Sequence, residues 1–146
     1  MLYIDTSVLL VYTLTQSLEP DRHPATAAFF SRIASGALSG ATSFYALHEL
    51  HVFALDNAPD FAMGTAFGRE ALHRVLSLPL QIFPLLSRIE RRRQASKFAA
   101  LRDSSDLPHV VVASVYGCEA IVACDHHFRA TSSILPYRSP EDFARP

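Results

Sequence analysis

The sequence predicts an α/β fold with a mainly parallel central sheet of four to five strands and helices on both faces. Short apolar runs, which are typical of buried strands, alternate along the chain with longer stretches whose apolar residues recur at helical spacing. Such alternation favours strand–helix–strand units, in which parallel strands lie side by side beneath covering helices. Because the 146 residues contain no repeat and no linker, we expect one domain over 1–146.

The first half of the chain is expected to form two strands and four helices. The strands are predicted at 2–4 and 38–42. A first helix follows the Thr-Ser pair after the first strand, and a second begins near Pro24 and stops before Gly36. Ser43 is expected to cap a helix from Phe44 to about Leu55, and a further helix is expected over 61–76.

The second half is expected to repeat this alternation. A third strand is predicted at 80–83, and Ser87 with Glu90 forms a capping box that opens a helix to about Arg102. The next helix follows the Ser104-Ser105-Asp106 run and ends at Gly117. A fourth strand is expected at 120–124, and the apolar pair at 134–135 is a candidate fifth strand.

Composition excludes several classes of protein. An apolar content of 49% excludes a disordered chain, and a net charge of −1 provides no overall positive field for nucleic acid, so any such binding must use local patches. The 2 cysteines, Cys118 and Cys124, indicate neither a zinc site nor a disulfide framework. The first residues lack a basic leader and no apolar run is long enough for a membrane span, so we expect a cytoplasmic protein.

Two aspartates each close an apolar strand. Asp5 follows Leu-Tyr-Ile, and Asp125 follows Ile-Val-Ala-Cys. Because ligand sites of open parallel sheets lie beyond the carboxyl ends of the strands, these two carboxylates can meet in one crevice. The alternative is that each aspartate only caps the turn that follows it.

Two further acids are candidates for the same crevice. Glu49 lies on an apolar face of its predicted helix, where a buried carboxylate requires a cation or another partner, although it could also reach water at the helix edge. Asp106 opens a helix, so N-capping alone would explain it, and Asp103 could replace it in either role. Four converging carboxylates would repel one another unless cations neutralised them. Oxygen ligands favour Mg²⁺ or Mn²⁺, which suit phosphoryl transfer and hydrolysis.

Four segments of the sequence, in order, resemble the conserved blocks of PIN domains. The first is the strand ending in Asp5-Thr6-Ser7, and the second runs from Thr42 to the Glu49 helix. The third is the segment 106–114, with an aspartate three residues before a histidine, and the fourth is 117–128, a strand followed by Asp125 and a phenylalanine. The order and spacing of the blocks agree over nearly the whole chain, whose size is similar to VapC-type toxins of toxin–antitoxin pairs.

The resemblance implies a PIN-like three-layer fold, cleavage of RNA with Mg²⁺ or Mn²⁺, a homodimer and a cognate antitoxin. It assigns catalysis and metal binding to a set of four acids, with two hydroxyl residues supporting the first. These are Asp5, Glu49, Asp106 and Asp125, supported by Thr6 and Ser7. The sequence departs from the family at Ala123, where a hydroxyl residue is usual, and at His127, where a further acid is common. Both departures lie beside Asp125, which could act through a bound water rather than as a direct ligand.

Two other groups of residues suggest possible contacts. Arg91, Arg92 and Lys97 lie on one predicted helix and could contact the RNA backbone, although a solvated helix face is the simpler interpretation. The adjacent His126 and His127 could ligate zinc, but they project differently and lack an obvious third ligand.

Three other functions compete with a toxin ribonuclease. The chain could be a catalytically weakened PIN-like module that binds RNA or protein, or a PIN nuclease of RNA processing. It could also be a phosphatase or phospho-acceptor with Asp5 as nucleophile, but Ser7 stands where such hydrolases use a second aspartate.

Overall fold

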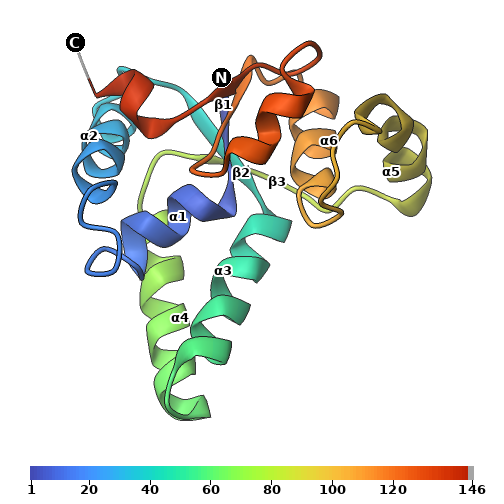
Figure 1. Ribbon diagram of the computed structural model, residues 1–146. Coiled ribbons are helices and arrows are strands. Elements are labelled where there is room, and N and C mark those ends of the chain that lie inside the picture. The colour runs from blue at the N-terminus through green and yellow to red at the C-terminus, as the bar shows by residue number, and fades with distance from the viewer. Residues whose placement is uncertain (145–146) are drawn as a thin grey trace.

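Residues 1–144 are described by a computed structural model, in which five parallel strands form one central sheet (Figure 1). The strands are β1 Leu2–Ile4, β2 Gly40–Ser43, β3 Gln81–Phe83, β4 Ala120–Val122 and β5 Tyr137–Arg138. Their order is β3-β2-β1-β4-β5, and every neighbouring pair is parallel. The predicted α/β class and parallel sheet are confirmed.

Helices connect the strands and cover the sheet. The α-helices are α1 Thr6–Thr13, α2 His23–Ala34, α3 Phe44–Asn57, α4 Phe61–Leu76, α5 Arg88–Ala95 and α6 Leu107–Val115. Short 3₁₀ helices are η1 Ser96–Phe98, η2 His126–Thr131 and η3 Pro140–Phe143. In Figure 1, α3 and α4 pack against each other and project from one end of the sheet, while α5 and α6 lie on the opposite side of the molecule from α2.

The sheet separates two apolar cores, as alternation along a strand requires. Leu2 and Ile4 of β1 face a core that includes Phe29 of α2 and Leu50 of α3. Tyr3, between them, faces a second core with Val110 of α6. Helices therefore cover both faces of the sheet, and the three-layer prediction is confirmed.

The helix after Ser87 is shorter than predicted. The capping box between Ser87 and Glu90 is present, but α5 ends at Ala95 rather than near Arg102. None of the residues of α5 is buried, so no packing supports its extension. The chain instead turns through η1, which buries Phe98.

The fifth strand lies at different residues from those predicted. It comprises Tyr137 and Arg138, whereas Ile134 and Leu135 belong to a turn in which both amides bond to the carbonyl of Thr131. Leu135 is buried there without being in a strand, which the apolar pattern alone does not distinguish. The second and fourth strands also differ at their ends from the predicted 38–42 and 120–124.

Strand pairing places two of the candidate acids at one edge of the sheet. Ile4 of β1 lies opposite Val122 of β4, so the segments that carry Asp5 and Asp125 leave the sheet side by side. β2 ends at Ser43, where α3 begins and carries Glu49 towards the same edge. The prediction that Asp5 and Asp125 follow the carboxyl ends of neighbouring strands is confirmed.

None of the helices formed by residues 1–144 has both the length and the apolar character needed to span a bilayer.

Candidate metal centre

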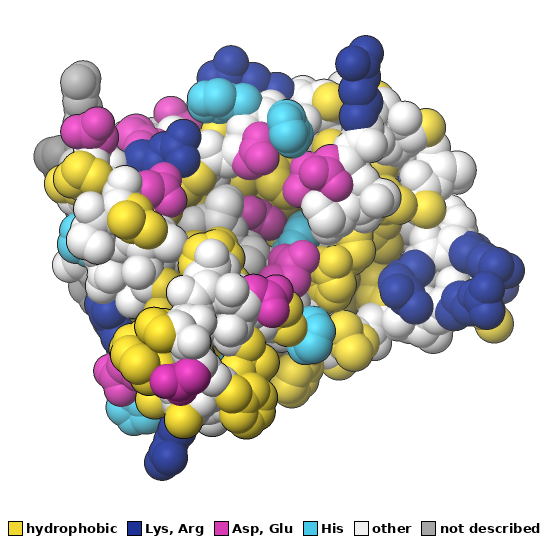
Figure 2. Space-filling model, turned by 60° about the horizontal axis from the view of Figure 1, so that its bottom comes forward, with side chains coloured by type: hydrophobic (Ala, Val, Ile, Leu, Met, Phe, Trp, Pro, Cys, Tyr) yellow, Lys and Arg dark blue, Asp and Glu magenta, His cyan; other side chains and the backbone are white. Residues whose placement is uncertain are grey.

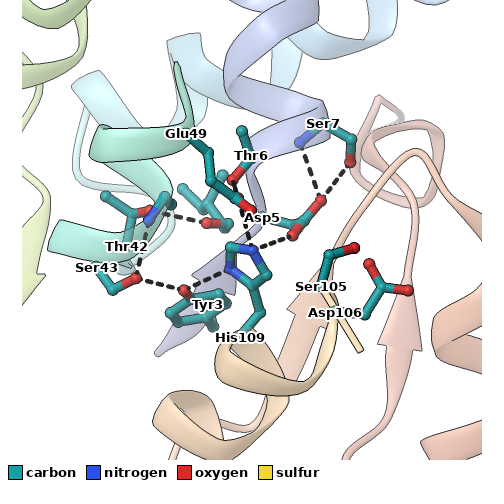
Figure 3. A network of polar contacts seen from close by, with 12 residues as sticks. Tyr3, Asp5, Thr6, Ser7, Thr42, Ser43, Glu49, Ser105, Asp106 and His109 are labelled. Atoms are coloured by element: carbon teal, nitrogen blue, oxygen red, sulfur yellow. Dashed lines mark hydrogen bonds and ion pairs between the residues drawn. The ribbon is translucent and has the colours of Figure 1, made fainter. Parts of the chain in front are cut away.

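Asp5 is a buried carboxylate held by the residues that follow it. It caps α1, and its Oδ2 accepts bonds from the Ser7 amide at 2.9 Å and the Ser7 hydroxyl at 2.6 Å (Figure 3). The Ser7 hydroxyl in turn accepts the amide of Cys124 at 3.0 Å. Ser7 thus fixes the orientation of Asp5 and ties it to the segment after β4.

Glu49 and Asp5 both contact the same histidine, His109. The Nε2 atom of His109 is 2.9 Å from Glu49 Oε2 and 3.5 Å from Asp5 Oδ1. The hydroxyl of Thr6 also donates to Glu49 Oε2. Figure 3 shows these side chains converging from α1, α3 and α6, with His109 between the two carboxylates.

A buried chain of polar groups orients His109 on the side of its ring away from the acids. Its Nδ1 is 2.9 Å from the Tyr3 hydroxyl, which is 2.7 Å from the Ser43 hydroxyl. Because Nδ1 is occupied by Tyr3, Nε2 is directed towards Glu49 and Asp5. Burial lowers the pKa of His109, but the charge of Asp5 and the bond to Glu49 outweigh it, so the pKa is raised above its usual value.

The same contacts favour the ionised form of Glu49. Burial raises the pKa of Glu49, but hydrogen bonds from His109 and Thr6 outweigh burial, so its pKa lies below the usual value. A charged His109 therefore balances part of the negative charge on Asp5 and Glu49.

Asp106 has a different environment. It precedes α6, but its side chain makes no capping bond to that helix. Its Oδ2 is buried and has no hydrogen-bond partner within residues 1–144. Burial, followed by the charges of Asp5, Asp103 and Asp125, raises the pKa of Asp106 to about 6. A buried carboxylate oxygen that accepts no hydrogen bond and lies among other carboxylates is chemically suited to a divalent cation.

Asp125 lies at the exposed rim of this cluster. Its Oδ1 accepts the amide of His127 and so caps η2, while its Oδ2 is 3.4 Å from the His127 ring. Asp125 therefore caps the turn that follows it, as Asp5 caps α1, and its second carboxylate oxygen lies near the His127 ring. Neighbouring Asp103 is exposed, and bonds from Ser105 lower its pKa.

The arginine-rich segment lies apart from the acids. Figure 2 shows acidic and histidine side chains gathered around a central hollow, with basic side chains over α5 at one side. Arg91 and Arg92 line a second hollow with Pro108 and Val111. Arg91 is close enough to Tyr45, a neighbour of Glu49, to affect the pKa of that tyrosine.

Three features of this cluster are not predicted by the sequence. A lone histidine such as His109 is most simply a structural hydrogen-bonder, and it does form hydrogen bonds, but to two of the candidate ligands. In the sequence, His127 is noted as a departure from the family and, with His126, as a possible zinc ligand, whereas in the structure it faces two aspartates. Tyr3 is assigned in the sequence only to a strand, but its hydroxyl contacts His109. The sequence signal for these contacts is that Tyr3, Asp5 and His109 all lie within the segments that resemble PIN-domain blocks.

We expect Asp106→Asn to stabilise the metal-free protein. The pKa of Asp106 is raised to about 6 in the folded state, so the protonated carboxyl favours folding. This contribution to the free energy of unfolding is fully present below the unfolded pKa of 3.8 and is lost as the pH rises through 6. At pH 7.5 the neutral variant should melt roughly 2–6 °C higher, equivalent to about 1 kcal/mol.

Thermal melts in EDTA, with Asp21→Asn as a control for loss of an exposed carboxylate, measure this effect. The advantage of Asp106→Asn should shrink as the pH falls from about 6 towards 4, where the wild-type carboxyl gains its proton. Mn²⁺ should raise the melting temperature of the wild type more than that of the variant. A variant less stable than wild type at pH 7.5 would contradict the repulsion inferred at Asp106.

Comparison with solved structures identifies similar folds. A chain of the VapBC2 structure from Rickettsia felis, bound to a promoter DNA fragment, matches with a TM-score of 0.68 and 14% identity, covering 95% of this chain and 98% of that chain. VapC20 of Mycobacterium tuberculosis, described as a sarcin-ricin loop cleaving toxin, matches at 0.65 and 16% identity, covering 93% and 98%. A VapBC-5 chain from the same organism matches at 0.57 and 21%, covering 94% of each chain.

The similarity to known proteins lies in the structure rather than in the sequence. No protein-family profile and no curated protein matches the sequence. The solved structures are similar over nearly the whole chain at low identity. The chain therefore has the PIN-domain fold that its sequence resemblance predicted.

Proposed function

We propose that this PIN-fold chain is a metal-dependent endoribonuclease that hydrolyses RNA phosphodiester bonds, and that it acts in the cytoplasm as the toxin of a VapBC-type pair. The proposal includes a cognate antitoxin and a homodimer. It is supported by the fold and by the cluster of Asp5, Glu49, Asp106 and Asp125.

The proposal rests on the Oδ2 atom of Asp106, which is buried without a hydrogen-bond partner among residues 1–144. A carboxylate that serves only as a cap or ion-pair partner should have both oxygens satisfied. This oxygen is buried, lacks a hydrogen-bond partner in the described part of the chain, and lies within the electrostatic reach of Asp5 and Asp125. Such a position is costly without a cation and favourable with one.

The residues divide into ligands and supports. Asp5 and Asp106 would hold a Mg²⁺ or Mn²⁺ ion, with Glu49 completing the charge of the site and Asp125 contributing from the rim. Ser7 and Thr6 would hold Asp5 and Glu49 in place through the bonds described above. When bound, the cation would lower the charge of the scissile phosphate and favour attack by water.

Attack by water in line with the leaving oxygen fixes the chemistry of the products. The water oxygen bonds to phosphorus, the bond from phosphorus to the 3′ oxygen breaks, and that oxygen takes a proton. The products therefore carry a 5′-phosphate and a 3′-hydroxyl. A metal-independent reaction through the ribose 2′-hydroxyl would instead leave a cyclic phosphate.

The proposal is tested by incubating purified protein with single-stranded RNA in Mn²⁺, Mg²⁺ or EDTA and mapping the product ends. We expect cleavage with either metal, 5′-phosphate ends and no cleavage in EDTA. Cyclic phosphate ends, or cleavage that continues in EDTA, would contradict the proposed chemistry.

A weakened, binding-only module is the second candidate. Ala123 is fully buried and provides no hydroxyl near Asp125, and His127 replaces the acid usual in the family. However, the Ser7 hydroxyl already connects Asp5 to the segment after β4, so a hydroxyl at position 123 is not needed for that link. RNA binding without cleavage in Mn²⁺ would favour this candidate.

RNA would be guided to the acids by Arg91, Arg92 and Lys97. The first two line the hollow beside α6, and the charge of Arg91 acts on the pKa of Tyr45, next to Glu49. Because the acid cluster itself repels phosphate, a separate basic surface is needed to hold the strand. Binding through these residues should weaken as salt increases.

Expression of an active toxin without its antitoxin should arrest growth. We expect induction of the wild-type chain in a bacterial host to slow growth strongly, and co-expression of the product of the adjacent gene to restore it. The Asp5→Asn variant, expressed to the same level, is the matched control and should not slow growth. Normal growth with abundant folded wild-type protein would favour the binding-only module or a nuclease of RNA processing.

A further inference from the structure

Three potential metal donors converge beside the proposed centre. One ligand atom each from Asp103, Asp106 and His127 lie within 4.8 Å of one another. Two of these residues belong to the segment before α6, and the third is in η2. The set differs from the four acids above because it contains an imidazole nitrogen and adds Asp103.

His127 is oriented towards the aspartates although its side chain is 64% exposed. Its Nδ1 is 3.8 Å from Asp106 Oδ2 and 3.4 Å from Asp125 Oδ2. The adjacent His126 points elsewhere, with its Nδ1 3.2 Å from the hydroxyl of Tyr137. Only one histidine of the pair therefore faces the acids, which excludes a site made by both.

The buried Asp106 oxygen is an independent indication of a ligand. The atom nearest His127 Nδ1 on Asp106 is the same Oδ2 that lacks a hydrogen-bond partner across residues 1–144. At 3.8 Å the two atoms are too far apart for a direct hydrogen bond. A cation between them would satisfy both atoms.

The position is open to solvent and to a substrate. A hollow of about 580 Å³ borders it, lined by Asp103 and His127 together with Arg102, Ser104, Ala100 and Ala130. A hydrated cation can enter from this side. A phosphate that reaches the cation would also approach the guanidinium of Arg102, which is suited to phosphate oxygens.

We propose that Asp103, Asp106 and His127 form a second divalent-cation position, which selects a transition metal such as Mn²⁺ over Mg²⁺. The inference rests on the proposed metal-dependent function, because Asp106 is shared between the two positions. Asp106 would contribute to both positions, and two neighbouring cations can stabilise both the attacking and the leaving oxygen in phosphodiester hydrolysis.

The donor set explains the selectivity. Mg²⁺ favours oxygen ligands in a strict octahedron with bonds of about 2.1 Å, whereas imidazole suits transition metals. Adjacent donor atoms around such a cation lie about 3 Å apart, so on metal binding the three donors must move closer to one another by about an ångström or more. Asp103 and His127 are both exposed and can make this adjustment towards the partly buried Asp106.

A different role for His127 predicts the opposite effect. A protonated His127 could act as an internal cation that neutralises Asp106 and Asp125 in place of a metal. Removal of His127 would then strengthen Mn²⁺ binding, because the metal ion would no longer compete with the imidazolium for the carboxylates. If His127 is a ligand, its removal weakens Mn²⁺ binding.

Calorimetric titration of the metal-free protein with Mn²⁺ and Mg²⁺ distinguishes these roles. We expect wild type to bind two Mn²⁺ ions, and His127→Ala to lose one site or weaken it at least ~10-fold, as loss of a metal-site contact commonly does. His127→Asp, which supplies oxygen at the same place, should retain Mg²⁺ binding and reduce the preference for Mn²⁺. His126→Ala is the matched control and should bind both metals as wild type does.

Paramagnetic broadening supplies a second readout that does not depend on activity. Substoichiometric Mn²⁺ should broaden the imidazole signals of His127 more than those of His126. Unchanged or stronger Mn²⁺ binding by His127→Ala, or equal broadening of both histidines, would overturn the second position. If one Mn²⁺ still bound and RNA were still cleaved, the proposed function would stand, whereas wild type that neither bound Mn²⁺ nor cleaved RNA would contradict both.

Discussion

Replacement of Asp5 by asparagine is expected to lower RNA cleavage by at least ~100-fold, because groups that stabilise charge in a transition state typically contribute that much. Asparagine has nearly the same size and can still accept a bond from Ser7, so the fold should persist. It removes one negative charge from the metal ligands. The rate should be measured with single-stranded RNA at saturating Mn²⁺, with Asp21→Asn as the control.

The other acids provide a graded series. Glu49→Gln and Asp106→Asn should lower the rate by similar factors, and Asp125→Asn should have a milder effect because that carboxylate lies at the exposed rim. Circular dichroism should show that each variant remains folded. An undiminished rate for Asp5→Asn would exclude the proposed ligand set, whatever the other variants do.

Much of the scaffold of the site is predictable from local sequence patterns. The runs before Asp5 and Asp125 are short, apolar and buried, and strands of this kind belong in the centre of a parallel sheet. Because parallel strands end at one edge, the sequence alone is enough to place the two aspartates together. The helix cap at Ser43 likewise fixes where the Glu49 helix begins.

The elements whose positions differ from prediction depend on packing rather than on local pattern. The residues after Ala95 have helical character, but the chain leaves the helix to bury Phe98. Leu135 is buried in a turn, and the strand that follows has only two residues. Neither result can be derived from spacing, because each depends on which surface the rest of the chain leaves uncovered.

The contacts within the site are also beyond sequence reasoning. Asp106 follows two serines and precedes Pro108, which favours an N-cap, yet its side chain does not cap α6. Its pKa is raised by burial and by the charges of Asp5, Asp103 and Asp125, and two of these three acids, Asp5 and Asp125, are distant in the sequence. His109 and His127 similarly acquire their roles from carboxylates on other elements.

Removal of the imidazole at position 109 is expected to have the largest effect on stability. His109→Leu would leave Glu49 and Asp5 without their shared donor and the buried Tyr3 hydroxyl without one of its partners. Loss of one partner in a buried, charged network costs about 3 kcal/mol or more. Urea unfolding in EDTA at pH 6 measures the loss, and His126→Leu is the control for an exposed histidine.

The pH dependence separates the charge of His109 from its hydrogen bonds. Because its pKa is raised in the folded state, the stability it adds is fully present below the unfolded value of 6.5 and is lost as the pH rises through the folded value. The difference between wild type and His109→Leu should therefore be larger at pH 6 than at pH 9. His109→Gln, which can donate a hydrogen bond but cannot be charged, should recover part of the loss at both pH values.

Mn²⁺ should also reduce the defect of His109→Leu, because a cation beside Asp5 supplies the positive charge that the variant lacks. An equal loss at pH 6 and pH 9 would show that the charged imidazole does not stabilise this cluster.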